Sequence, residues 1–172
     1  MFFTILDLIL ILIIFCFIAF GFALGLVQVI GALIGVVLGT WAAGMYYEPV
    51  GAWLESILLG HGNVARVFAF ILIFVVINRL VGLIFWVINK IFHIISIIPF
   101  TKFFNRILGA IFGLFEGILV LGLILYFVSR FSISAWLDAA LAGSLVAAWL
   151  VWLSSILTPL LPVVLQQIKS VI

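Results

Sequence analysis

The sequence predicts an all-α protein that crosses a lipid bilayer several times, and its composition is the first reason. The chain has 172 residues, of which 69% are hydrophobic and only 7% are charged. In ordinary soluble domains about 25% of the residues are charged. Seven basic and five acidic side chains cannot keep a protein of this size in solution. A water-soluble fold is therefore excluded, and the mean hydropathy of +1.63 and the 16% aromatic content favour membrane helices with interfacial rings.

The first two spans are predicted within the uncharged stretch between Asp7 and Glu48. A single helix over these forty residues would be about 60 Å long, twice the thickness of the hydrocarbon core. The stretch must fold back, and we predict a turn from Gly21 to Gly25 between spans at 5–21 and 26–46. Thr4 and Asp7 have the spacing of a capping box. Asp7 is therefore interpreted as a helix cap rather than a proton relay.

Two further spans are predicted at 67–89 and 107–129, each long enough to cross the bilayer. Each contains a single charged residue, Arg79 in the third span and Glu116 in the fourth. Between spans two and three we predict a small amphipathic helix on the membrane surface that begins at Pro49. Its apolar residues recur at helical spacing: Val50, Trp53, Leu54, Ile57 and Leu58.

The C-terminal part, residues 131–172, is predicted to form a hydrophobic segment beyond a four-span domain at 1–130. Serines and prolines interrupt its apolar run, and Trp136, Trp149 and Trp152 are typical of interface anchors. Two alternatives stay open: a fifth span at 135–157, or a hairpin that lies within the membrane. Residues 158–172 begin with a Thr-Pro pair, which predicts a short interfacial helix.

The distribution of basic residues predicts the orientation. The stretch 90–106 contains Lys90, Lys102 and Arg106 and no acid, whereas 47–66 contains Arg66 and two glutamates. Because positive loops stay on the cytoplasmic side, we expect 90–106 to be cytoplasmic. The N-terminus and the loop 47–66 then lie outside.

Spans two and four carry a glycine at every fourth residue. Helices associate in lipid by close backbone approach, which glycine faces allow. We therefore predict that these faces pack closely, against each other or against a second copy. The glycines are Gly31, Gly35 and Gly39 in span two, and Gly109, Gly113 and Gly117 in span four.

Arg79 and Glu116 are the candidate polar site, because they are the ionised residues well inside predicted spans. Arg79 lies about 20 Å along the helix from Arg66 at the outer edge, and Glu116 about 15 Å from Arg106 at the inner edge. In a core about 30 Å thick the two depths agree within a side-chain length. We predict an intramembrane pair. The alternative is that Arg79 extends to the cytoplasmic headgroups while Glu116 is protonated.

No catalytic, cofactor-binding or metal-binding residues are predicted. His61 and His93 lie on opposite sides of the membrane by the assigned topology, and neither has a partner at metal-ligand spacing. No Gly-x-Ser-x-Gly motif or intramembrane pair of acids is present. Cys16 is the single cysteine and cannot form an intrachain disulfide. The small, scattered net charge of +2 argues against nucleic acid as a partner.

The order of these features resembles a known family. An acid heads span one, a Gly-Phe-x-x-Gly turn follows at Gly21, Phe22 and Gly25, and span two is rich in glycine and alanine. A basic stretch then leads into Asn-Arg-Ile-Leu-Gly-Ala-Ile-Phe-Gly-Leu at 105–114. Over roughly residues 5–130 the chain is similar to the colicin V production proteins, a family of bacterial inner-membrane proteins.

The resemblance implies a small multi-pass protein of the bacterial cytoplasmic membrane, linked to toxin production or export and to envelope function. We expect it to be no enzyme and to need no cofactor. Its expected partners are the lipid bilayer and either export and envelope proteins or further copies of itself. The alternative function is a small oligomeric channel or transporter built on the glycine faces and on Arg79 and Glu116.

Overall fold

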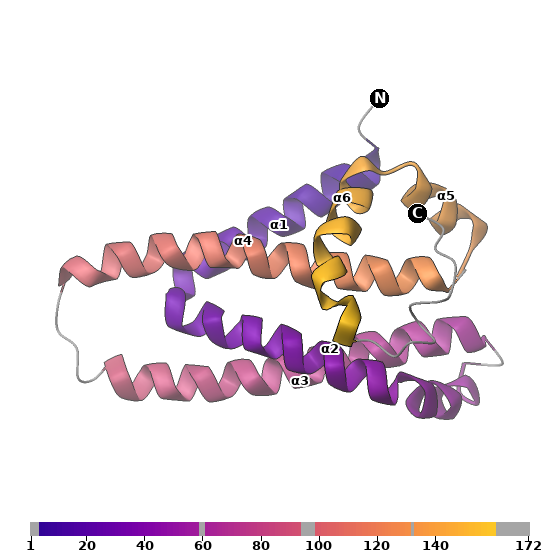
Figure 1. Ribbon diagram of the computed structural model, residues 1–172, viewed down its shortest axis with the longest axis horizontal. Helices are drawn as coiled ribbons and strands as arrows, with labels where there is room; N and C mark the ends of the chain where they lie inside the picture. The colour runs from indigo at the N-terminus through magenta and orange to yellow at the C-terminus, as the bar shows by residue number, and fades with distance from the viewer. Residues whose placement is uncertain (1–3, 59–60, 94–98, 132, 161–172) are drawn as a thin grey trace.

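The computed structural model describes residues 4–58, 61–93, 99–131 and 133–160, and every regular element in this part of the chain is helical. Four long helices come first: α1 (Ile5–Leu24), α2 (Leu26–Glu55), α3 (Gly62–His93) and α4 (Pro99–Arg130) (Figure 1). Two short helices, α5 (Ala135–Ala142) and α6 (Leu145–Ser154), and a 3-10 helix, η1 (Ser155–Leu160), follow. All four long helices contain segments apolar enough to cross a membrane, which confirms the predicted all-α membrane bundle.

The reversal between α1 and α2 occurs at Gly25 alone, so the predicted turn from Gly21 to Gly25 is too long. Gly25 has a φ of 84°, a conformation that glycine adopts readily, and its N–H donates to the carbonyl of Gly21 at 2.9 Å. Gly21 itself remains helical. The 20 residues of α1 give a helix about 30 Å long, which matches the hydrocarbon core.

The separate surface helix predicted from Pro49 is also wrong, because α2 continues through this residue to Glu55. Proline inside a helix removes one hydrogen bond and kinks the axis without always ending it. The last turns of α2 bend away from the rest of the helix (Figure 1). Similarly, α3 and α4 have 32 residues each and extend well into the stretch 90–106. Only 94–98 lies outside the described residues between them.

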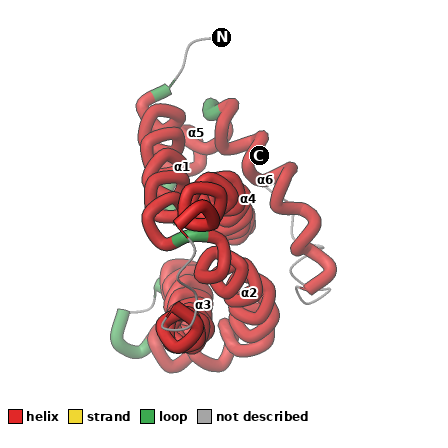
Figure 2. The backbone as a smooth tube through the Cα atoms, turned by 90° about the vertical axis from the view of Figure 1, so that its left-hand side faces the viewer, coloured by secondary structure: helices red, strands yellow, loops and turns green. Residues whose placement is uncertain are grey.

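The long helices form two layers, α1 beside α4 and α2 beside α3, and contacts of α2 with α4 join them (Figure 2). The glycine faces pack within these layers. Gly109 and Gly113 lie against Gly21 and the backbone of Phe17. In the other layer the glycines of α2 lie against α3: Gly31 against the Phe85 side chain, and Gly35 and Gly39 against the backbone and side chains of Asn78 and Phe74.

The glycine faces of spans two and four therefore pack closely, as predicted, but they do not meet each other, so the first of the two expected arrangements is wrong. Each face is filled by the other helix of its own layer. Equal glycine spacing in two helices indicates that both approach something closely, but it does not identify the partner.

Aromatic rings connect the two layers at the end of the bundle near Arg66 and Arg130. Phe70 of α3 stacks on Phe127 of α4 with ring centroids 3.8 Å apart, and Tyr47 of α2 meets Phe127 edge-on at 5.1 Å. Such contacts add to the energy of burial itself. This aromatic core fixes the layers at one end, whereas α3 and α4 diverge toward the other end (Figure 1).

The hydrophobic C-terminal segment is bent rather than straight. The axes of α5 and the helical stretch that begins with α6 differ by 82° across a break at Gly143 and Ser144. The ten residues of α6 give a length of about 15 Å, half of what a span needs. In Figure 1, α6 runs across α4 instead of along it. This geometry favours the hairpin over a straight fifth span. Of the interfacial helix predicted at 158–172, only the first three residues are described, and they belong to η1.

Candidate functional site

The most connected polar group in the bundle is the carboxylate of Asp7, which has no exposed surface. Thr4 precedes α1 and forms the capping box with it. The backbone N–H and the hydroxyl of Thr4 donate to Oδ2 at 2.7 and 2.8 Å, and the N–H of Asp7 donates to the Thr4 hydroxyl at 3.2 Å. The acid therefore stabilises the start of α1, as its spacing from Thr4 predicts.

The second oxygen of Asp7 binds a distant part of the chain. Its Oδ1 accepts a hydrogen bond from the Ser144 hydroxyl at 2.5 Å and another from the backbone N–H of Val146 at 2.9 Å. The Ser144 oxygen in turn accepts from the N–H of Ala147 at 3.0 Å. One carboxylate thus caps two helices, α1 and α6, at the ends where the helix dipole favours negative charge.

This arrangement is suited to holding a structure together. The four donors that reach Asp7 match the four acceptor positions of a carboxylate. No acceptor position is left for a substrate or a proton donor. Asp7 therefore fixes the break between α5 and α6 to the head of α1, a role that the capping pattern at Thr4 could not reveal.

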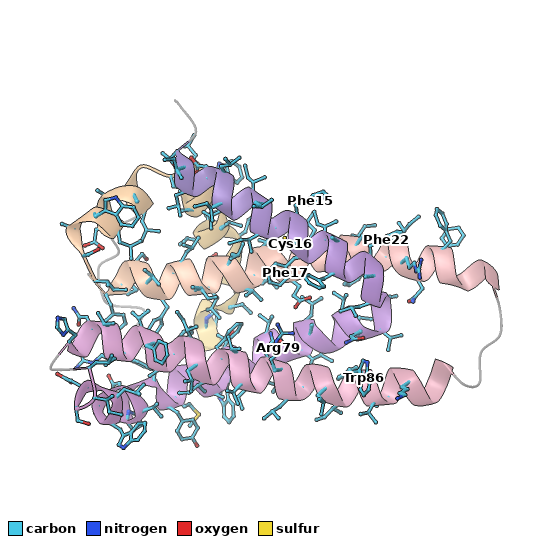
Figure 3. The ribbon with its side chains drawn as sticks, turned by 180° about the vertical axis from the view of Figure 1, so that it is seen from behind. Phe15, Cys16, Phe17, Phe22, Arg79 and Trp86 are labelled. Atoms are coloured by element: carbon cyan, nitrogen blue, oxygen red, sulfur yellow. The ribbon has the colours of Figure 1, made fainter. Side chains whose placement is uncertain are left out.

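Arg79 and Glu116, the predicted intramembrane pair, come close without touching. Figure 3 shows Arg79 projecting from α3 toward the layer of α1 and α4. It lies near enough to act electrostatically on Glu116. In the part of the chain that the structure describes, no hydrogen bond or salt bridge joins the two side chains, so their pairing stays a prediction.

A charge exchange tests this pairing. Arg79→Glu and Glu116→Arg should each lower the yield of folded protein, because each places two like charges near each other in the low-dielectric interior. The double variant should recover much of the yield. Folded yield from membranes, measured by size-exclusion chromatography, is the readout, and Lys90→Glu at the end of α3 is the control. Additive losses in the double variant would show that the two residues act independently.

Three other basic residues lie over aromatic rings near helix ends: Lys90, Arg106 and Arg130. The Lys90 ammonium is 5.0 Å from the Trp86 ring centre, and the guanidinium of Arg106 is 5.8 Å from that of Phe22. These distances are in the range of cation–π contacts, which suit the interface between lipid and water. Lys90 and Arg106 mark the end of the bundle for which the sequence predicts a cytoplasmic location.

Two residues have roles that the sequence analysis missed. The Asn105 side chain accepts a hydrogen bond from the N–H of Leu26 at 3.1 Å and so caps α2 from α4. Its amide also lies directly against Gly25, where any side chain would overlap it. Ser144 is the second residue, and a serine before an apolar helical run is a local cap signal. No local signal connects it to Asp7. Among the described residues, no group of three or more His, Cys, Asp or Glu side chains is placed to hold a metal ion.

Comparison with known proteins supports the family resemblance that the order of the sequence features indicated. The family model for the colicin V production protein matches residues 6–157, a range that includes the four long helices except for the first residue of α1, and both residues of the Asp7–Ser144 contact. Comparisons with curated proteins and with solved structures return no match. The match covers most of the sequence, so this multi-pass membrane protein belongs to the colicin V production protein family.

Proposed function

We propose that the protein is a non-enzymatic component of the bacterial cytoplasmic membrane that serves toxin production or export, and envelope function, by binding other envelope or export proteins. The family match over residues 6–157 is the observation that carries this proposal. The polar groups support it. Asp7 is fully engaged within the protein, and the central turns of the described spans contain only two ionised side chains, Arg79 and Glu116. Two such side chains offer few polar contacts to a solute that would cross the membrane through the protein.

The proposed function is tested by a deletion strain and by crosslinking in native membranes. Cells without the protein should export less of a peptide toxin of the colicin V kind, and the full-length gene should restore export. Crosslinking followed by mass spectrometry should recover export or envelope proteins attached to the chain. Unchanged toxin export together with crosslinks to the chain alone would overturn the proposal.

Flux assays distinguish the proposal from the channel or transporter alternative. Purified protein in liposomes should not increase the passage of ions or small solutes. Flux that appears with the wild type and disappears with Glu116→Gln would support a channel and contradict a role through partners alone.

The proposed orientation places the basic end, with Lys90 and Arg106, in the cytoplasm and the head of α1 outside. Single cysteines at positions 55 and 102, introduced into a Cys16→Ser background, test it. A thiol reagent that cannot cross the membrane should label Glu55→Cys on intact cells and leave Lys102→Cys unmodified until the cells are opened. The opposite labelling pattern would invert the topology.

A further inference from the structure

The outward face of α6 is unusually apolar and is not covered by the described part of the chain. Between 40 and 73% of each side chain is exposed at four positions with helical spacing: Trp149, Trp152 and Leu153 of α6, and Ile156 of η1. The two tryptophan rings meet edge-on at 5.9 Å and flank Ala148 in a shallow apolar hollow. The opposite face is buried against the bundle through Ala147, Leu150 and Ser154.

The position of α6 along α4 gives its depth in the membrane. At Gly122 of α4 the two backbones come so close that an added Cβ would overlap the carbonyl oxygen of Leu150 and lie 2.6 Å from Cβ of Ser154. Gly122 is eight residues before Arg130, which ends α4 and directly follows the span predicted at 107–129. Eight residues correspond to about 12 Å, whereas half the hydrocarbon core is about 15 Å thick. The crossing point therefore lies well inside the core.

A helix that starts inside hydrocarbon needs partners for its first N–H groups, because no water is available there. The structure supplies them. Asp7 accepts from the N–H of Val146, and Ser144 accepts from that of Ala147. The free N–H groups after the break between α5 and α6 are thus hydrogen-bonded within the protein. Irregular backbone is tolerated at membrane depth only when its polar groups are satisfied in this way.

We propose that α6 is a re-entrant helix that lies in the plane of the membrane, within the hydrocarbon of the leaflet that holds the head of α1. Its occupant is lipid: acyl chains of that leaflet cover Trp149, Trp152 and Ile156. The helix takes up volume in one leaflet and not in the other. Asp7 is the positioning residue that keeps the start of α6 in place. This inference rests on the membrane location of the bundle and is independent of the proposed role in toxin export.

Depth-dependent fluorescence quenching tests this position. The chain has six tryptophans, so a variant that keeps only Trp152, with phenylalanine at the other five positions, reports on α6. It is reconstituted in vesicles of phosphatidylcholine brominated near the headgroup, in the middle or at the end of the acyl chains. Because the crossing point lies about 12 Å into a half-core about 15 Å thick, quenching should be strongest with bromine in the middle or at the end of the acyl chains. A matched variant that keeps only Trp41, an exposed residue within span α2, is the positive control.

Each other quenching pattern would overturn the proposal. Strongest quenching near the headgroup would place α6 on the membrane surface, outside the hydrocarbon core. No quenching, with Trp41 still quenched, would mean that protein or water covers this face.

A spin-label measurement covers the case in which the single-tryptophan chain does not fold. With Leu153→Cys in a Cys16→Ser background, a label on α6 should be more accessible to oxygen, which dissolves in hydrocarbon, than to a water-soluble nickel complex. Higher accessibility to nickel would contradict the proposal. Adding Gly122→Leu, which removes the space for α6 on α4, should shift the balance toward nickel.

Discussion

Replacing Asp7 with leucine should destabilise the protein by about 3 kcal/mol, because it removes the shared acceptor of four hydrogen bonds in a dry environment. The N–H of Val146 and the hydroxyl of Ser144 lose their carboxylate partner, and each buried orphan donor costs about 1–3 kcal/mol. Asp7→Asn should be intermediate, since an amide keeps the shape but offers one acceptor oxygen and adds donors. Equilibrium unfolding in mild detergent with added SDS measures the loss.

The effect should also be local, which hydrogen exchange can show. The amides of Val146 and Ala147 should exchange faster in Asp7→Leu, whereas those around Phe70 and Phe74 in the aromatic core should change little. Ser144→Ala removes one of the four bonds to Asp7 and is the matched partial variant. In a double-mutant cycle the two substitutions should cost less together than the sum of their separate effects. Equal stability of Asp7→Leu and wild type would show that the carboxylate does not hold α6.

Gly109→Ala should destabilise the contact between α1 and α4 by about 1–3 kcal/mol or more, although it adds only a methyl group. That methyl would overlap the carbonyl oxygen of Gly21 and lie 2.8 Å from Cα of Gly25. Both obstacles are backbone atoms, which cannot rotate away as a side chain does. The two helices must separate, and much of their dispersion energy is lost.

Gly82→Ala is the matched control, since nothing lies within 4 Å of the Cβ it adds and it is also within a membrane helix. Alanine is the better helix former, so this variant should be as stable as the wild type or slightly more so. The same SDS titration measures both variants. Equal stability of Gly109→Ala and Gly82→Ala would mean that the close approach at Gly21 and Gly109 does not occur in the folded protein.

The four long helices were predictable from the sequence because hydrophobic length is a strong constraint in lipid. The boundaries were less accurate. The start of α2 at Leu26 was placed correctly, but the end of α1, the helical state of Gly21 and the continuation of α2 through Pro49 were not. Glycine and proline indicate where a helix can end. Whether it does end depends on neighbours such as Gly109, which Gly21 must approach closely.

Of the contacts around Asp7, only those with residues nearby in the sequence could be predicted. The capping box of Thr4 and Asp7 spans four consecutive residues and is visible as a pattern. The contact with Ser144 joins residues 137 positions apart, and the cap that Asn105 gives to Leu26 joins residues 79 apart. Helical periodicity carries no information about such pairs, because it describes each helix alone.

The pairing of α1 with α4 also affects how the chain is made. The close contact joins Gly21 to Gly109, so 88 further residues must be synthesised before α1 can meet its main partner. At about 5–20 residues per second this interval is roughly 4–18 s. During it, α1 must remain in the bilayer with lipid around most of its surface. Its mean hydropathy of 3.0 is the highest of the four spans, and its one charged residue is at its head. The composition of α1 therefore suits a helix that is inserted into the bilayer well before it docks against α4.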